Sequence, residues 1–211
     1  MKITLYNIKG WAGKTPIATN IVLDREYALA TNEPYNILST FIPEDRLLNV
    51  ELEVPFPSIP DHIDIVFDLA WSISKKSLSI PSAIEQSDVV IVPIYNELKC
   101  LSAGLNTIIE VANFNKNIIV VATKLIKQKG DHSPDWKQCQ DFKNIERMIQ
   151  SKIDFKIPIL PLKLSKAFDL IFEHETSIEW LQKANPLAHY TYREVRNQFD
   201  DLYFLIDTYA K

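Results

Sequence analysis

The sequence predicts an α/β fold, a three-layer sandwich in which helices cover both faces of a mostly parallel, twisted sheet. Three apolar runs, at residues 63–68, 87–93 and 118–123, are typical of buried strands. Segments with helical spacing alternate with these runs, which is the pattern of parallel strands joined by helical crossovers. The 211 residues, 46% of them hydrophobic, are enough for one sizeable core, so we expect a single domain over residues 1–211.

Periodicity and proline positions define the elements of the first half of the chain. Residues 2–6 alternate between polar and apolar side chains, as a strand does, and residues 16–23 change to helical spacing. A second strand is predicted at residues 27–31. Four prolines interrupt residues 37–61, where residues 49–54 alternate as an edge strand would.

The second half continues the same alternation. The predicted elements are a short helix at 81–86, a strand at 87–93, an amphipathic helix at 98–114, a strand at 118–123, a polar loop at 127–136, a helix at 136–149 and a strand at 156–162.

Composition excludes several classes of function. The net charge of −4 and the pI near 5.6 argue against a strongly basic nucleic-acid-binding protein, although a local patch is compatible with them. No apolar run approaches the ~20 residues of a membrane span, and no signal peptide is evident. Cys100 and Cys139 lack C-x-x-C spacing, which suits a reducing cytoplasm. The four histidines are scattered, so a metal site built on them is disfavoured.

The stretch from Asn7 to Thr15 carries the clearest chemical signal. It lies between the first strand and the first helix and contains two of the four glycines, Gly10 and Gly13. Glycine lets backbone N–H groups approach an anion, and the helix start adds unpaired N–H groups. Lys14 would reach the outer phosphates of a nucleotide, and the Thr15 hydroxyl would ligate Mg²⁺. The simpler alternative is an ordinary strand-to-helix turn with an exposed lysine.

The general phosphate-loop pattern G-x-x-x-x-G-K-[ST] is matched only in part, because Ile8 replaces its first glycine. Residues Lys9 to Thr15 resemble more closely the K-G-G-x-G-K-T loop of the ParA/MinD-type ATPases, which carry a deviant Walker A motif. Asn7 and Asn20 also match residues common around that loop. The resemblance implies a P-loop NTPase-like fold, and it implies that Lys9 reaches across a dimer interface to the partner's nucleotide.

Two departures from the family motif affect the expected nucleotide contacts. Trp11 replaces a glycine, so a left-handed backbone angle is harder to adopt there. Pro16 follows Thr15 and has no N–H, so a backbone contact to the α-phosphate is lost. The nucleotide would otherwise be held by the residues of the loop and the helix start, namely Gly10, Trp11, Ala12, Gly13, Lys14, Thr15 and Pro16.

The resemblance assigns roles to three residues outside the loop. Asp68, at the end of a predicted buried strand, corresponds to the acid of the family's D-x-P-P segment and would hold Mg²⁺ through water. Glu33 is the nearest equivalent of the acid that places the attacking water, although Thr31 stands where the family has a first Asp. Lys124 lies where such folds contact the base. The plain alternatives are a strand-end Asp that caps a turn, a turn glutamate and a solvated lysine.

Together these features predict a ParA-like ATPase for plasmid or chromosome partition or positioning. It would use ATP and Mg²⁺, form a homodimer through the nucleotide and hydrolyse ATP slowly. Its partners would be a centromere- or cargo-binding adaptor protein and non-specific DNA. Membrane binding is not expected, because the final helix, which runs to about Tyr209, is acidic.

Three alternatives stay open at this point. The chain could be a degenerate interaction module in plasmid maintenance or transfer, with weak or no hydrolysis, since Trp11, Pro16 and Thr31 depart from the family pattern. It could also be a metabolic relative that resembles dethiobiotin synthetase. A basic patch near the C-terminus could bind DNA, or its members could form a mixed-charge surface; they are Lys163, Lys166, Lys183, Arg193 and Arg196.

Overall fold

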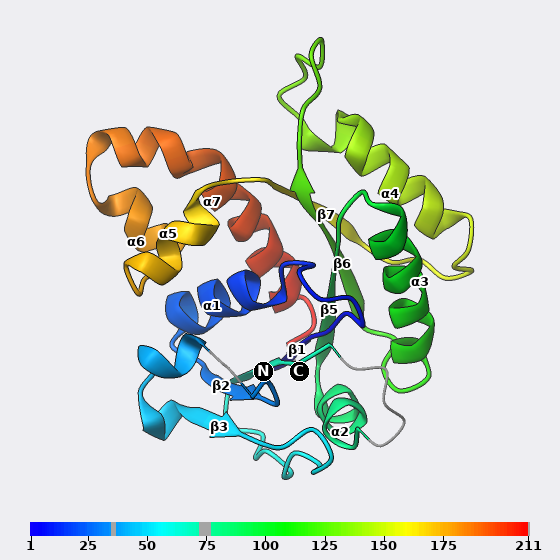
Figure 1. Ribbon diagram of the computed structural model, residues 1–211, viewed down its shortest axis with the longest axis vertical. Coiled ribbons are helices and arrows are strands. Elements are labelled where there is room, and N and C mark those ends of the chain that lie inside the picture. Colours follow the sequence, from blue (N-terminus) through cyan, green and yellow to red (C-terminus); the bar gives the residue numbers. More distant parts are fainter. Residues whose placement is uncertain (35–36, 72–76, 211) are drawn as a thin grey trace.

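The computed structural model of the protein describes residues 1–34, 37–71 and 77–210 (Figure 1). Its centre is a sheet of seven strands in the order β3-β2-β4-β1-β5-β6-β7, and every pairing between neighbouring strands is parallel. The strands are β1 (Lys2–Leu5), β2 (Ala28–Thr31), β3 (Leu47–Asn49), β4 (Ile65–Asp68), β5 (Val89–Ile94), β6 (Ile118–Leu125) and β7 (Ile159–Lys163). The predicted α/β fold class is confirmed.

Helices cover both faces of the sheet, as the sequence predicts. One core forms where α2 (Ser79–Gln86), α3 (Leu98–Ala112) and α4 (Gln140–Gln150) pack on the sheet. The other face carries the remaining helices of Figure 1, which are α1 (Lys14–Arg25), α5 (Ala167–Glu173), α6 (Ile178–Lys183) and α7 (Pro186–Asp207). Alternate residues of each strand serve the two cores, since Val90 faces the first and Ile91 the second. This arrangement explains why the strands read as continuous apolar runs.

The strand order places a topological switch beside β1. Strands β2, β3 and β4 lie on one side of β1 in the sheet. Strands β5, β6 and β7, which follow later in the chain, lie on the other side. Because all the strands are parallel, their carboxyl ends meet at one edge of the sheet. In open α/β sheets, ligands bind at that edge near the switch point.

The predicted edge strand at residues 49–54 is wrong in its position. The edge strand is β3, which ends at Asn49, and the chain then turns, with the N–H of Val54 bonded to the carbonyl of Glu51 (3.0 Å). The alternation that suggested a strand arises because Val50 and Leu52 pack against the core from this turn. Apolar alternation alone therefore did not distinguish a strand from a turn that faces the core.

Two helices differ in detail from the prediction. The segment predicted as a helix at 136–149 begins with a 3₁₀ turn at Trp136–Gln138, and α4 starts only after Cys139, whose backbone is extended. The final helix, α7, starts at Pro186 and is capped by the Asn185 side chain, which accepts from the N–H of Ala188 (2.9 Å). Its buried residues pack on the sheet face that α1 also covers. Within the described ranges, none of the helices has the length and apolar character needed to span a bilayer.

Candidate functional site

The loop between β1 and α1, residues 7–13, crosses the carboxyl edge of the sheet and is called the glycine loop below. Buried hydrogen bonds hold both of its ends. The side-chain amide of Asn7 donates to the carbonyl of Pro93 in β5 (2.7 Å). The hydroxyl of Thr123 in β6 donates to the carbonyl of Ala12 (2.9 Å). The two neighbouring strands therefore fix the path of the loop.

Gly13 sets the start of α1. Its φ of 101° lies in the left-handed region that favours glycine, and α1 begins with the next residue, Lys14. The first turn of a helix has N–H groups without intrahelical partners, and they carry a partial positive charge. The side chain of Lys14 is only 5% exposed, so its ammonium adds a buried positive charge at the same place. This combination attracts anions, and phosphate groups in particular.

Trp11 has a backbone conformation that is usually adopted by glycine. Its φ is 65°, a conformation that costs a non-glycine residue roughly 1–3 kcal/mol. The indole is 88% exposed, so it does not fill the space over the loop. The tryptophan at this position thus strains the backbone of the loop without closing the space over it.

Asp68, at the carboxyl end of β4, is the acidic centre of the site. Burial raises the pKa of its carboxyl to about 7, and the nearby Glu33 adds to the rise, whereas Lys14 and a hydrogen bond from Thr15 lower it. Its Oδ1 atom is buried without a hydrogen-bond partner among the described residues. An unsatisfied buried carboxylate oxygen is costly, and carboxylate oxygen is a ligand that Mg²⁺ prefers.

Thr31, at the carboxyl end of β2, supports the neighbouring residues. The sheet register pairs it with Asp68. Its hydroxyl donates to the carbonyl of Asp68 (2.8 Å) and accepts from the N–H of Glu33 (3.1 Å). Thr31 therefore fixes Glu33 next to Asp68, a role that sequence analysis missed because it depends on the register of two distant strands.

Asn32 is a second supporting residue that sequence analysis missed. It is almost fully buried, donates to the hydroxyl of Ser79 (2.7 Å) and accepts from the N–H of Ala70 (2.6 Å). It joins the end of β2 to the start of α2 and to the segment after β4. Its position just before Glu33 and Pro34 is the only sequence signal that could have suggested this role.

A cavity of about 790 Å³ opens over the glycine loop. Its polar lining includes Gly10, Lys14, Thr15 and Glu33, and its apolar lining, from β7, α5 and the segment between them, includes Leu162, Leu164, Phe168 and Phe172. A cavity with a cationic part and an apolar part fits a ligand that carries both phosphate and a flat apolar group. The indole of Trp71 lies beside Gly10 and lines both this cavity and a neighbouring one of about 690 Å³.

Comparison with known proteins identifies solved structures with the same fold. No family model and no curated protein matches the sequence. Solved structures match over nearly the full chain. Apo McdA from Cyanothece shares 12% identity, with a TM-score of 0.65 and coverage of 94% of this chain and 98% of that one. The fold is that of the ParA/MinD-type ATPases.

Two further structures with this fold were solved with nucleotides. The septum site-determining protein MinD from Pyrococcus horikoshii, complexed with Mg-ADP, shares 12% identity, with a TM-score of 0.58 and coverage of 97% of each chain. A putative plasmid partition protein from Borrelia burgdorferi, bound to AMPPNP, shares 15% identity, with a TM-score of 0.53 and coverage of 94% of this chain and 98% of that one.

Within this ParA/MinD-type fold, most of the residues predicted for the site lie together. The cavity lining contains Gly10, Trp11, Gly13, Lys14, Thr15, Pro16, Glu33 and Lys124. Asp68 lies next to them, within reach of Thr15. Ala12 does not line the cavity, since its side chain is in the core and its carbonyl is bonded to Thr123.

Lys124 and Lys9, the two predicted site lysines other than Lys14, differ in their position relative to the cavity. Lys124 lines the cavity, but its ammonium lies 4.6 Å from the centre of the Tyr95 ring, so Tyr95 already provides it with a stacking partner. Lys9 is half-buried and is not part of the cavity lining, and its backbone N–H is bonded to the side chain of Asn7 (2.7 Å).

The residues of the predicted basic patch are largely paired with acids. Lys163 bonds Glu194, and Lys183 bonds Glu179. Arg196 pairs with three acids, Asp24, Glu179 and Asp200. Of the two interpretations left open by the sequence, the mixed-charge surface fits the C-terminal region better. Asp88, directly before β5, accepts from the N–H of Lys2 (2.8 Å) and so has a structural role.

Proposed function

We propose that this chain is a Mg²⁺-dependent ATP-binding switch of the ParA/MinD kind, which positions or partitions a cargo and hydrolyses ATP slowly. The observation that carries the proposal is the buried Oδ1 of Asp68, which lies beside Thr15 and Lys14 and has no hydrogen-bond partner in the described part of the chain. A Mg²⁺-bound triphosphate at the start of α1 would supply a cation for this oxygen.

The residues present fit a magnesium ion. The Thr15 hydroxyl and the Asp68 carboxylate would hold it, directly or through water. No group of three or more His, Cys, Asp or Glu side chains converges within the described part of the chain, so the other ligands would be phosphate oxygens and water, as is usual for Mg²⁺. When bound, the ion neutralises charge on the phosphates.

The remaining roles follow from position. The N–H groups of the glycine loop and the ammonium of Lys14 would hold the phosphates. Glu33, held by Thr31, would orient the attacking water, and phosphoryl transfer needs little more than such placement. Lys124 and the apolar residues of α5 would flank the base, and Lys9 would contact the nucleotide of a second subunit.

The nucleotides bound in structures with a similar fold support this proposal. One carries Mg-ADP, another AMPPNP, and a third is an ATP complex of McdA. One of the matching structures is a complex of MinC with MinD, which shows that this fold can serve protein partners. For this chain we propose an adaptor that recognises the cargo. If the function is partition, non-specific DNA is a further proposed partner, and the paired residues near the C-terminus are poor candidates for its binding surface.

Calorimetry with ATP in millimolar Mg²⁺ tests the proposal. The wild type should bind ATP, and Lys14→Ala should bind it at least roughly a hundredfold more weakly, since it removes a charge-assisted contact to phosphate. Lys129→Ala, which removes an exposed lysine far from the loop in sequence, is the matched control and should bind as the wild type does. Absence of ATP binding by the wild type would end the proposal.

A second candidate function is a degenerate interaction module. Pro16, which offers no N–H to a phosphate, and the strained Trp11 are the observations that favour it. In that case Lys14→Ala should keep full binding to the protein partner. If Lys14→Ala loses ATP binding and partner binding together, the module interpretation is excluded.

A further inference from the structure

Asn20 links the start of α1 to the start of α6. Its side chain is fully buried, and both ends of its amide are bonded. The Nδ2 group donates to the carbonyl of Pro16 (2.7 Å), and Oδ1 accepts from the N–H of Ile178 (2.8 Å). Pro16 lines the cavity, whereas Ile178 is the first residue of α6. One planar amide therefore joins the cavity wall to another helix.

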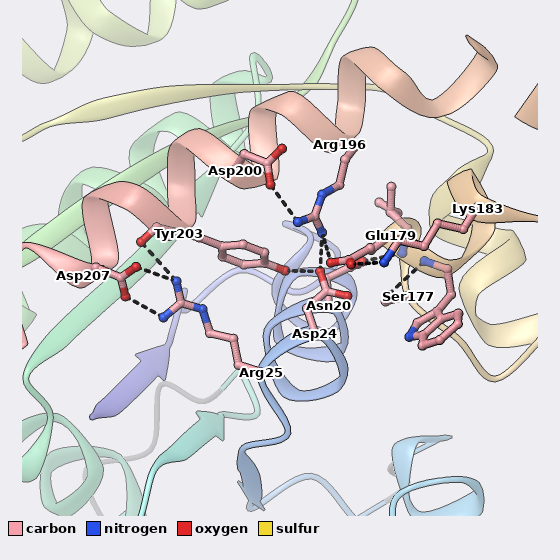
Figure 2. A network of polar contacts seen from close by, with 12 residues as sticks. Asn20, Asp24, Arg25, Ser177, Glu179, Lys183, Arg196, Asp200, Tyr203 and Asp207 are labelled. Carbon is pink, nitrogen blue, oxygen red and sulfur yellow. Dashed lines mark hydrogen bonds and ion pairs between the residues drawn. The ribbon is translucent and has the colours of Figure 1, made fainter. Parts of the chain in front are cut away.

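The rest of α1 is fastened to α7 (Figure 2). The carboxylate of Asp24 accepts from Arg196 (2.7 Å) and from the hydroxyl of Tyr203 (2.7 Å). Arg25 pairs through both of its terminal nitrogens with the carboxylate of Asp207. These contacts lie within the last two residues of α1, and Asn20 lies one turn earlier. Because Asp24 is buried, its pair with Arg196 restricts sliding of α1 against α7.

Helix α5, which precedes α6 in the chain, also lines the cavity. Phe168 and Phe172 in α5 line the cavity, and α5 leads within a few residues to Ser177, which caps α6 by accepting from the N–H of Trp180 (3.4 Å). A ligand in the cavity would touch Pro16 and α5 together. Asn20 and the short connection from α5 to α6 would then both link the cavity to α6, in addition to Arg196, which pairs with Asp24 in α1 and Glu179 in α6.

We propose that Asn20 is a positioning residue that couples nucleotide binding in the cavity to the docking of α6 and α7. The inference rests on the proposed function, because it needs ATP to bind in the cavity. A bound nucleotide restrains Pro16, which restrains the Asn20 amide and strengthens its bond to α6. Since coupling between two equilibria is reciprocal, loosening α6 must weaken nucleotide binding by the same factor.

Hydrogen exchange measures this coupling directly. In the wild type, Mg-ATP should slow the exchange of the α6 amides, Ile178 to Lys183, by roughly tenfold. Asn20→Asp keeps an acceptor for the N–H of Ile178 but places a carboxylate against the carbonyl of Pro16. That variant should lose the ATP-dependent slowing and bind ATP roughly tenfold more weakly.

A pH series separates positioning from a general structural defect. Protonation of the introduced carboxyl restores a donor for the Pro16 carbonyl, so the ratio of variant to wild-type Kd should return toward one in acid. Thr19→Val is the matched control, because it removes a bond to the Thr15 carbonyl (2.7 Å) without touching α6. It should keep the ATP-dependent slowing of α6. If Asn20→Asp does not fold, Ser177→Ala removes the N-cap of α6 and should weaken ATP binding several-fold.

The outcomes separate this inference from the proposed function. A wild type that does not bind ATP overturns both. A wild type that binds ATP with unchanged exchange in α6 overturns the coupling alone. An affinity loss in Asn20→Asp that does not recover in acid overturns the positioning role of Asn20, and ATP affinity unchanged in Ser177→Ala overturns the reciprocal coupling.

Discussion

The hydroxyl of Thr123 in β6 donates a 2.9 Å hydrogen bond to the carbonyl of Ala12, a residue 111 positions earlier in the chain. Both residues are buried, so water is not available to replace this bond. The bond fixes the glycine loop one residue before Gly13, where the backbone turns into α1. The geometry of the loop therefore depends on a strand that lies more than a hundred residues further along the sequence.

Thr123→Val should destabilise the protein by about 1–2 kcal/mol, because it keeps the shape of the side chain and leaves the Ala12 carbonyl unsatisfied. ATP affinity should fall as well, since the loop is no longer fixed. Urea denaturation and calorimetry measure the two effects. Thr191→Val removes a similar hydroxyl-to-carbonyl bond at an exposed site on α7 and should cost less than about 0.5 kcal/mol. Equal costs at the two sites would contradict this account.

Gly13→Ala should separate backbone strain from function when compared with Gly130→Ala. Both glycines have φ near 100°, and neither would place a new Cβ in a close contact. Each variant should therefore lose a similar stability, about 1–2 kcal/mol. Only Gly13→Ala should also weaken ATP binding, because only Gly13 lies at the cavity. Equal ATP affinities of the two variants would count against the loop as the phosphate site.

Asp68 should make the stability of the nucleotide-free protein depend on pH. Burial raises the pKa of its carboxyl from 3.8 to about 7. Between these values the folded state binds more protons than the unfolded state, so the free energy of unfolding falls as pH rises from about 4 to about 7 and is level above that.

Asp68→Asn removes this dependence. At pH 8 the variant should be more stable than the wild type, by up to about 4 kcal/mol, and near pH 4 the difference should largely vanish. Urea denaturation at several pH values, without Mg²⁺ or nucleotide, measures it. Asp201→Asn, at an exposed position of α7, is the matched control and should follow the wild-type curve. Parallel curves for Asp68→Asn and the wild type would show that the buried carboxyl does not titrate in this way.

Lys9→Ala should distinguish binding within a subunit from binding across an interface. Lys9 does not line its own cavity, so ATP affinity of the monomer should stay within about twofold of the wild type. Dimer formation in the presence of ATP should be lost, because the proposed contact of Lys9 is with the partner's nucleotide. Light scattering with and without ATP gives the result. A large loss of monomer affinity would instead place Lys9 at its own phosphates.

The sheet could be predicted from the sequence where its strands are buried on both faces. The runs at 63–68, 87–93 and 118–123 needed no tertiary information, because burial on both sides makes the centre of each run continuously apolar. The edge strand could not be placed, since Val50 and Leu52 are apolar for a reason unrelated to a strand. The start of α7 was also missed, although Asn185 and Pro186 are a capping pair that local chemistry could have revealed.

Some residues of the candidate site could likewise be predicted from the sequence, and others could not. Gly13, Lys14 and Thr15 are consecutive, so their chemistry is visible in the sequence. Thr31 and Thr123 are threonines with unremarkable neighbours, and their partners lie 37 and 111 positions away. Only the register of the sheet shows what these hydroxyls contact.

The short edge strand β3 restricts how copies of this chain can associate. It pairs through three residues only, and prolines follow it at positions 55, 57 and 60. A short edge strand followed by prolines offers few unpaired backbone amides to a strand of another molecule, which disfavours edge-to-edge pairing of sheets and aggregation. Pairing of copies through this edge is thereby disfavoured, and a variant that lengthens β3 should aggregate more readily.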